Sequence, residues 1–302
     1  MNLLNTLTAE QYLSDGKKYI ESALEKFLPS HDAYPQSIHQ SMRYSVLAGG
    51  KRLRPILVIA AAEAVGGRRE QVLPFAIAVE FIHTYTLIHD DLPALDNDNL
   101  RRGKPTNHKV FSEAIAILAG DALLTEAFIL MTNRILMDSI PSKNLLQASH
   151  EMARSIGSRG VIGGQVVDIE SEGKDVDPET LEYIHIYKTG YFFKSCIRSG
   201  AILCQTSQAQ LSALSRFGAH IGLAFQIIDD ILDITGDEEL LGKDIGSDIN
   251  KKKATYPALF GIEESRKKAE TLVEEGIEIL RSFDERANPL REIARFFVQR
   301  TF

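Results

Sequence analysis

The sequence predicts a single all-α domain, and three observations favour this fold class. Apolar residues recur at helical spacing, and in residues 75–92 and 214–235 they cover several faces, as they do in buried helices. No regular alternation of short strands with turns is visible. Although 302 residues leave room for one or two domains, no linker or low-complexity segment divides the chain, so we expect one domain over residues 1–302.

The remaining elements follow from local pattern. Residues 264–283 form an amphipathic stretch with a charged outer face, and residues 291–300 predict a terminal helix. The β-branched segment VIGGQVVDI (161–169) is compatible with a strand, but it has no pairing partner, so we predict a helix or a helix end. Polar residues predict two long loops, at 97–108 and 236–253. Prolines are expected to break or start helices at Pro55, Pro74, Pro93, Pro141, Pro178, Pro257 and Pro289.

Charge and cysteine usage narrow the function classes. Lys and Arg number 34 against 41 Asp and Glu, a net charge of −7, so no overall basic field for nucleic acid exists. Cys196 and Cys204 lack CxxC spacing, which disfavours a disulfide framework and a thiolate metal site. Neither a basic leader before an apolar core nor a run of about eighteen uncharged apolar residues occurs. We therefore expect a cytoplasmic protein without a membrane span.

Two acidic pairs end apolar helical segments: LIHDD (87–91) and QIIDD (226–230). Buried carboxylates are costly unless they meet cations. In the second copy, four polar residues spaced i, i+3, i+4 and i+7 share one helix face: Gln226, Asp229, Asp230 and Asp233. In the first copy, Asp90 and Asp91 precede Asp96, and a continuous helix would turn about 600° between Asp90 and Asp96. Pro93 must therefore interrupt the helix if Asp96 joins the same site.

These six carboxylates predict a Mg²⁺ site. Mg²⁺ prefers carboxylate oxygens together with phosphate oxygens and retained water. A single acidic pair is as readily explained as a solvated helix end, but two pairs in apolar helices favour a site.

Basic residues are interleaved with the acidic ones. GGKRLRP (49–55) places Lys51, Arg52 and Arg54 after a Gly-Gly turn. Further cations and their polar neighbours are Arg101, Arg102, Lys188, Thr189, Lys243 and the run 251–253. The planar, bidentate guanidinium of Arg and the compact ammonium of Lys both bind diphosphates. Isolated runs of charge are usually only solvated surface, and we interpret Lys251 and Lys252 in this way. The pattern predicts two anion sites, one bridged by Mg²⁺ and one held by side-chain cations.

His83 lies seven residues before Asp90, so the two share a helix face about two turns apart, roughly 10 Å. A lone histidine on such a face is most simply a core residue with satisfied hydrogen bonds.

Taken together, DDLPALD, the arginine pair, GGKRLRP, GGQVVD, KTG and FQIIDDILD resemble the trans-isoprenyl diphosphate synthases, and most of all the bacterial short-chain farnesyl diphosphate synthase type. The motifs occur in order over residues 40 to 260. The resemblance implies ten or more helices around a deep central cavity, usually in a homodimer. One departure is at Asn97, Asp98 and Asn99, where the family has several Asp residues; we expect this to alter field strength rather than ligation.

The resemblance also assigns roles. It implies three Mg²⁺ ions held by the aspartates Asp90, Asp91, Asp96, Asp229, Asp230 and Asp233. It implies isopentenyl diphosphate bound by Lys51, Arg54, His83 and Arg102. It implies the allylic or departing diphosphate bound by Arg101, Lys188, Thr189, Gln226, Lys243 and Lys253, with Lys251 and Lys252 as competitors for the last role. The expected catalytic residues are Lys188, Asp90, Asp229 and Arg101.

The implied reaction is ionisation of the allylic diphosphate, attack by the alkene of isopentenyl diphosphate and loss of a proton. Because water would quench the cation, we expect a lid, with residues 243–253 and Arg300 as candidates. Family members set product length by bulk four and five residues before the first aspartate, here Thr86 and Tyr85. Tyr85 is the expected floor for a fifteen-carbon product, unless it is a plain core tyrosine.

Four alternatives stay open at this point. A geranylgeranyl diphosphate synthase differs only in cavity depth. A terpene cyclase shares an aspartate-rich motif but needs no second cationic diphosphate site. An HD-type metal phosphohydrolase could use His89 and Asp90 with His83 and His185, although no spacing supports it. A non-catalytic subunit would tend to lose motif residues, and none is visibly missing.

Overall fold

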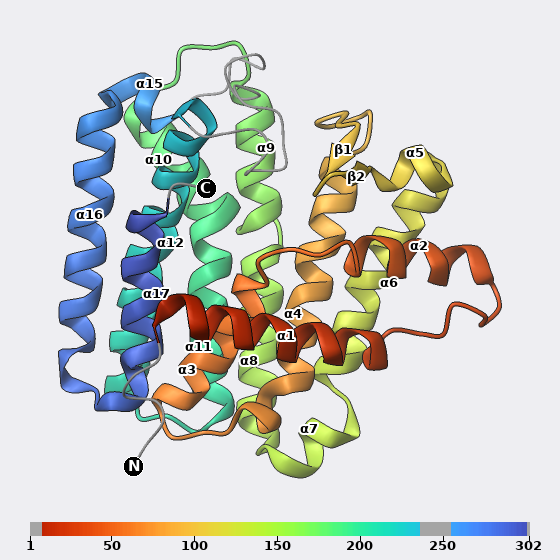
Figure 1. Ribbon diagram of the computed structural model, residues 1–302, viewed down its shortest axis with the longest axis horizontal. Coiled ribbons are helices and arrows are strands. Elements are labelled where there is room, and N and C mark those ends of the chain that lie inside the picture. The colour runs from red at the N-terminus through yellow and green to blue at the C-terminus, as the bar shows by residue number, and fades with distance from the viewer. Residues whose placement is uncertain (1–7, 236–254, 301–302) are drawn as a thin grey trace.

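The computed structural model describes residues 8–235 and 255–300. Outside one small hairpin, the ordered elements of these residues are helical (Figure 1). The α-helices are α1 Ala9–Phe27, α2 Gln36–Val46, α3 Leu53–Ala64, α4 Arg69–Asp90, α5 Asn107–Phe111, α6 Glu113–Met131, α7 Arg134–Ser139, α8 Ser142–Ile156, α9 Val161–Ser171, α10 Pro178–Ile184, α11 Tyr191–Leu203, α12 Gln208–Thr235, α15 Tyr256–Phe260, α16 Ile262–Ile279 and α17 Asn288–Gln299. A π-helical stretch, His185–Gly190, joins α10 to α11 and is called the π segment below. Two 3₁₀ turns, Leu280–Ser282 and Glu285–Ala287, precede α17.

The expected all-α class is confirmed, and the segment at 161–169 is helical, as predicted. One expectation was wrong in detail. Within the polar loop at 97–108, β1 (Leu100–Arg101) and β2 (Lys104–Pro105) pair antiparallel. Positive φ angles at Arg102 (54°) and Gly103 (73°) make the tight turn between them. A pair of two-residue strands leaves no periodic signal in a sequence.

Helix ends follow the expected chemistry. Thr8 and Gln11 form a capping box at the start of α1. Pro178 occupies the first turn of α10, after the Asp177 cap. Pro74 is the exception, because it lies inside α4 rather than at an end.

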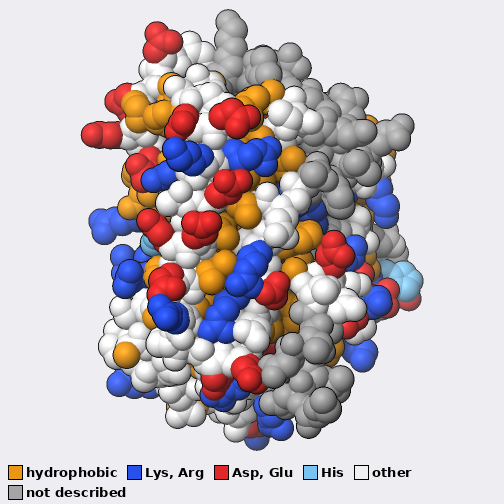
Figure 2. Space-filling model, turned by 60° about the vertical axis from the view of Figure 1, so that its left-hand side comes forward, with side chains coloured by type: hydrophobic (Ala, Val, Ile, Leu, Met, Phe, Trp, Pro, Cys, Tyr) orange, Lys and Arg blue, Asp and Glu red, His pale blue; other side chains and the backbone are white. Residues whose placement is uncertain are grey.

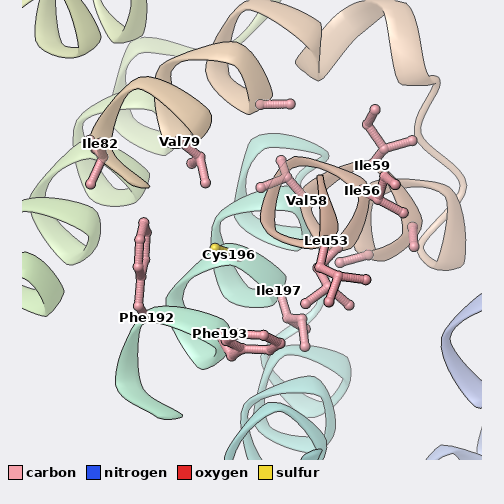
Figure 3. Packing of buried hydrophobic residues seen from close by; sticks show 14 of the residues in the cluster. Leu53, Ile56, Val58, Ile59, Val79, Ile82, Phe192, Phe193, Cys196 and Ile197 are labelled. Carbon is pink, nitrogen blue, oxygen red and sulfur yellow. The ribbon is translucent and has the colours of Figure 1, made fainter. Parts of the chain in front are cut away.

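One part of the extended hydrophobic core lies between α3, α4 and α11. Figure 3 shows Val58 from α3, Val79 and Ile82 from α4, and Phe192 from α11 turned toward one another. These side chains are at most 2% exposed, so water is excluded where they meet. At Gly200 of α11 a Cβ atom would lie 2.1 Å from the Val58 carbonyl oxygen, so α11 approaches α3 backbone to backbone. The close packing fixes α3 and α4, which both carry predicted site residues.

In Figure 1, α12, α16 and α17 run side by side at one end of the molecule, and α2 and α6 lie at the other. Figure 2 shows acidic and basic side chains interspersed over the face that carries α16. The charged outer face predicted for residues 264–283 is confirmed, and it has no large region of one sign.

Three helical stretches are long and apolar enough, by length and composition alone, to cross a membrane: Arg69–Asp90, Glu113–Ser139 and Gln208–Thr235. In the most apolar 18-residue window of the first and the third, 72% and 56% is buried inside the protein, so they serve as core helices. The second is only 39% buried and leaves Ile117, Leu118 and Ile129 exposed. This apolar surface of α6 is not covered by the described residues.

Candidate active site

The first aspartate motif is a turn that closes on itself. Helix α4 ends at Asp90, and Asp91 is its C-cap. The chain then turns through exposed Pro93, and the Asp96 backbone N–H donates to the Asp90 carbonyl oxygen at 2.8 Å. The predicted interruption at Pro93 is therefore confirmed. Asp96 returns to Asp90 by a hydrogen bond, not by helical periodicity.

Arg101 fixes the second carboxylate of this motif. Its Nε donates to Oδ1 of buried Asp91 at 2.9 Å, and its Nη2 contacts the same oxygen. Nη2 also lies 3.1 Å from Oδ2 of Asp98. Asp98 is the one acid retained among residues 97–99, and it helps to orient Arg101 toward Asp91.

Negative charge accumulates around Asp90. Burial, followed by repulsion from Asp96 and Asp91, raises the pKa of Asp90 to about 6, and Lys188 and Arg101 act in the opposite direction. A cation bound here would offset both the burial cost and the repulsion.

The second aspartate motif lies on α12. Asp229 is half-buried, and its Oδ1 lies 3.6 Å from Nη2 of Arg300, at the end of α17. The charge of Asp229 also acts on Arg54 and partly offsets the pKa lowering that burial causes in that guanidinium. Asp229 therefore lies within electrostatic range of the predicted diphosphate cations. Asp233, one turn further along, is buried.

Both oxygens of Asp230 are engaged by protein donors. Oδ2 accepts from the Tyr256 backbone N–H at 3.0 Å and lies 2.8 Å from Nε2 of His185. Oδ1 accepts from Gln226 Nε2 at 2.9 Å, and Gln226 Oε1 accepts from Thr189 Oγ1 at 2.8 Å. Asp230 thus ties α12 to the π segment and to α15, and it holds Gln226 and Thr189 in fixed orientations.

Among residues 8–235 and 255–300, no three Asp, Glu, His or Cys side chains converge closely enough to hold a metal by themselves. The donors nevertheless fit Mg²⁺, because Asp90, Asp91, Asp96 and Asp229 offer hard oxygen atoms. Magnesium usually takes one or two carboxylates and completes its shell with substrate phosphate and water. The three predicted ions stay a prediction.

Lys188 projects from the π segment and is oriented by α9. Its Nζ donates to Asp168 Oδ2 at 2.6 Å. A Cβ atom at Gly164 would lie 2.3 Å from the Lys188 backbone nitrogen, so only glycine lets α9 approach this closely. The glycines of GGQVVD therefore serve packing, and its aspartate orients the predicted catalytic lysine.

The predicted metal-free anion site forms a cationic cluster. Arg54 Nη1 lies 3.3 Å from His83 Nε2, and Arg102 contacts the Gly49 carbonyl oxygen. Burial lowers the pKa of His83 well below 6.5, and Arg54 and Arg102 lower it further, so the imidazole is neutral near pH 7. Burial, with neighbouring arginines, also lowers the pKa of Arg102 to about 10. Crowded cations of this kind are stabilised by a bound anion.

Other basic residues of this region play different parts. Arg52 is buried, and its Nη1 donates to Glu80 Oε1 at 2.5 Å while its Nη2 donates to the Val46 carbonyl oxygen at 2.7 Å. It therefore holds α3 against α4. Lys51 is exposed at the start of α3. Lys243, Lys253 and the predicted lid at 243–253 lie outside the described residues.

The two predicted chain-length residues lie one turn before the first aspartate motif. Tyr85 is 6% exposed, its ring packs edge-on against His89 at 5.7 Å, and its hydroxyl has no hydrogen-bond partner among the described residues. Thr86 is half-buried and donates to the His83 carbonyl oxygen. A central cavity beneath them stays a prediction.

Sequence reasoning missed the supporting residues. Asp168 belongs to the GGQVVD motif, but its partner Lys188 is 20 positions away, so local pattern does not connect the two. His185 was considered only as a metal ligand, whereas it bonds to Asp230. His89 Nε2 faces the Ile117 carbonyl oxygen at 3.0 Å. Neither contact supports the phosphohydrolase alternative, in which both histidines would hold one metal.

The helices bring together two aspartate motifs, the first near Lys188 and the second near Arg54. This arrangement is typical of enzymes that bind two diphosphates. Residues 35–291 match the Polyprenyl synthetase family. A geranylgeranyl diphosphate synthase of Cyanophora paradoxa is 49% identical over 96% of this chain and 95% of its own. A farnesyl diphosphate synthase of Bacillus subtilis is 46% identical over 90% of this chain and 91% of its own. The crystal structure of an FPP/GFPP synthase from Zymomonas mobilis superposes with a TM-score of 0.85 at 35% identity, covering 96% of this chain and 98% of the other.

The chain belongs to the polyprenyl synthetase family. It is a prenyltransferase, a short-chain trans-prenyl diphosphate synthase with the isoprenoid synthase fold.

Proposed function

We propose that the protein condenses isopentenyl diphosphate with dimethylallyl diphosphate and then with geranyl diphosphate, giving farnesyl diphosphate and diphosphate. The observation that carries the proposal is the presence of two clusters of opposite charge, each suited to one diphosphate. Asp90, Asp91 and Asp96 form an acidic cluster that a bound cation would stabilise, so a diphosphate would bind there through Mg²⁺. Arg54, His83 and Arg102 form a cluster of positive charge that a diphosphate would stabilise directly.

In this proposal the allylic diphosphate binds on the aspartate side. Asp90, Asp91, Asp96 and Asp229 would hold Mg²⁺, which when bound supplies electrophilic assistance to the departing diphosphate. Lys188, held by Asp168, and Thr189, held by Gln226, contact the same oxygens. Arg101 orients Asp91 through its two-nitrogen contact and opposes the rise in the pKa of Asp91 that burial causes.

Isopentenyl diphosphate binds through Arg54 and Arg102, with neutral His83 as a further hydrogen-bond partner. Arg54 is held in place between Phe192 and Phe193, whose ring centroids lie 5.1 and 5.0 Å from its guanidinium carbon. A fixed cation fixes the diphosphate, and with it the alkene beside the allylic carbon.

The reaction then balances without another reagent. The allylic carbon–oxygen bond breaks and its electron pair leaves with the diphosphate. The alkene of isopentenyl diphosphate attacks the allylic carbon, forming the new carbon–carbon bond. One proton leaves the resulting cation, taken up by the departing diphosphate, and the chain is five carbons longer.

The fifteen-carbon product is proposed from the bulk of Tyr85, whose buried ring stands one turn from Asp90. Geranylgeranyl diphosphate is the second candidate. It is favoured by relatives named geranylgeranyl synthases at 49% and 50% identity, against 46% for the Bacillus subtilis farnesyl diphosphate synthase.

The assay is incubation with Mg²⁺, labelled isopentenyl diphosphate and each allylic starter, followed by measurement of product length. A fifteen-carbon product supports the proposal, a twenty-carbon product transfers it to the second candidate, and no condensation contradicts both. Tyr85→Ala is expected to release longer chains. Tyr85→Phe is the matched control, because the tyrosine hydroxyl has no hydrogen-bond partner in the described part of the chain and the ring bulk is kept. It should leave product length unchanged.

We also propose that the protein acts in the cytoplasm and forms a homodimer through α6. The support is the exposed apolar surface of Ile117, Leu118 and Ile129, continued on α7 by Ile135 and Met137. Leu118→Glu should shift the protein to a monomer in sedimentation velocity, while Leu146→Glu, at a more exposed leucine on α8, should not.

A further inference from the structure

A cavity apart from the predicted central one lies against the π segment and is called the second cavity below. Its volume is about 630 Å³, and its lining comes from α8, α10, the π segment, α11, α12 and α16. Within residues 8–235 and 255–300, none of the predicted diphosphate or metal residues lines it. A cavity of this size is within the range of small-molecule sites.

Cations dominate the charged lining of this second cavity. Arg154 and Arg159 are exposed, and within the described part of the chain neither makes an ion pair. Lys194 is half-buried, and its Nζ lies 6.0 Å from the centroid of the Tyr191 ring. Glu182 is the one acid among the described lining residues. In a chain of net charge −7, this local excess of positive charge predicts an anionic occupant.

The rest of the lining is aromatic and aliphatic. Tyr183, Tyr187 and Tyr191 follow one another at four-residue intervals, with ring centroids 4.4 and 5.9 Å apart. Leu223 of α12 and Leu272 of α16 add aliphatic surface. An inorganic anion would leave this surface uncovered, whereas an anion with an apolar body would bury it.

The cavity shares a wall with the proposed catalytic machinery. Ile186, Tyr187 and Gly190 of the π segment line the cavity, while the intervening Lys188 and Thr189 are bonded to Asp168 and Gln226. The π segment also packs against α12 backbone to backbone, because a Cβ atom at Gly222 would lie 2.8 Å from Cα of Gly190. Because Tyr187 and Lys188 are adjacent in the chain, a ligand that displaces the backbone at Tyr187 also displaces Lys188. Single π turns are rare and frequently occur at functional sites.

We propose that this cavity is a second ligand site, which takes an amphiphilic organic phosphate, and that its occupancy changes the affinity of the allylic site through the π segment. The proposal that a ligand binds in the second cavity is independent of the proposed function. The proposal that this ligand changes the affinity of the allylic site rests on the proposed function. The occupant is either a free small molecule or the headgroup region of an anionic lipid, because both present a phosphate beside an apolar body.

Binding is measured by isothermal titration calorimetry with monomeric dodecyl phosphate in the presence of EDTA, which suppresses magnesium-dependent binding at the allylic site. Wild type should bind, and Arg154→Glu/Arg159→Glu should bind at least about tenfold more weakly. Lys267→Glu/Lys268→Glu, on α16, carries the same charge change outside the cavity and should bind like wild type. Ala219→Phe keeps every charge, fills the cavity and should also lose binding. Equal affinity in all four proteins would overturn the site.

Further arms separate the source of the ligand. Octyl glucoside and inorganic phosphate, each lacking half of the chemistry, should bind much more weakly than dodecyl phosphate. Co-sedimentation with phosphatidylglycerol vesicles that is lost in Arg154→Glu/Arg159→Glu, without binding of the monomer, assigns the lipid headgroup as the source. For coupling, dodecyl phosphate should change the KM for the allylic substrate in wild type and not in Ala219→Phe. The same KM change in both proteins would overturn the coupling while leaving condensation intact.

Discussion

Arg300 Nη2 lies 3.6 Å from Asp229 Oδ1, and the same guanidinium stacks 4.2 Å from the centroid of the Phe225 ring. It also donates to the Phe225 carbonyl oxygen at 3.2 Å, so the end of α17 is tied to the second aspartate motif of α12. Arg300 was expected as a lid residue, and the structure gives it a fixed place beside Asp229.

Replacing Arg300 should therefore disturb Asp229. We expect Arg300→Gln to lower kcat by about tenfold through misplacement of the carboxylate, and to lower the free energy of unfolding by about 1–3 kcal/mol, because a buried hydrogen-bonded cation is lost. Steady-state kinetics and urea unfolding measure the two effects. Arg295→Gln removes an exposed ion pair on the same helix and serves as control, with little change in either quantity. Equal behaviour of the two variants would contradict the role of Arg300.

Asp230 offers a test between ligation and positioning. Because its oxygens already accept from Tyr256, His185 and Gln226, we expect Asp230→Asn to raise the KM for the allylic substrate while leaving the Mg²⁺ concentration for half-maximal rate near the wild-type value. Asp229→Asn should shift the Mg²⁺ requirement strongly. A comparable shift in both variants would restore Asp230 as a metal ligand.

Gly164 should not tolerate a methyl group. In Gly164→Ala the new Cβ would meet the Lys188 backbone at 2.3 Å, so we expect overpacking to cost about 1–3 kcal/mol of unfolding free energy and kcat to fall as Lys188 moves. At Gly276 of α16 the nearest atom to a new Cβ is 3.4 Å away. Gly276→Ala should therefore be neutral or stabilising by up to about 1 kcal/mol. Thermal and urea unfolding of the pair decide the matter.

His83 predicts a pH dependence of stability. Its folded-state pKa is lowered below 6.5 by burial and by Arg54, so the unfolded chain binds more protons than the folded one below that pH. The free energy of unfolding should fall as pH drops below about 6.5, with a limiting slope of about 1.4 kcal/mol per pH unit from this group. Urea unfolding of His83→Gln should show a shallower slope from pH 7 to 5.5, whereas His150→Gln, at an exposed position, should match wild type.

The fold class and both aspartate motifs could be predicted because they depend on local pattern. Helical geometry alone predicts that the helix is interrupted at Pro93, and apolar residues on several faces of α4 and α12 predict buried helices. The supporting contacts could not be predicted in the same way. Asp168 with Lys188, and Asp230 with His185, join residues 20 and 45 positions apart, and only the packing of α9, α12 and the π segment brings them together.

The turn that returns Asp96 to Asp90 has an evolutionary consequence. The spacing between these two carboxylates is set by a surface-exposed bend beyond the last turn of α4, with Pro93 and Ala94 open to water. Residues can be added to or removed from such a bend without re-registering the helix against its neighbours. Insertions or deletions in this bend would thus change the spacing of the two carboxylates, and with it diphosphate binding, while the packing of the core stays the same.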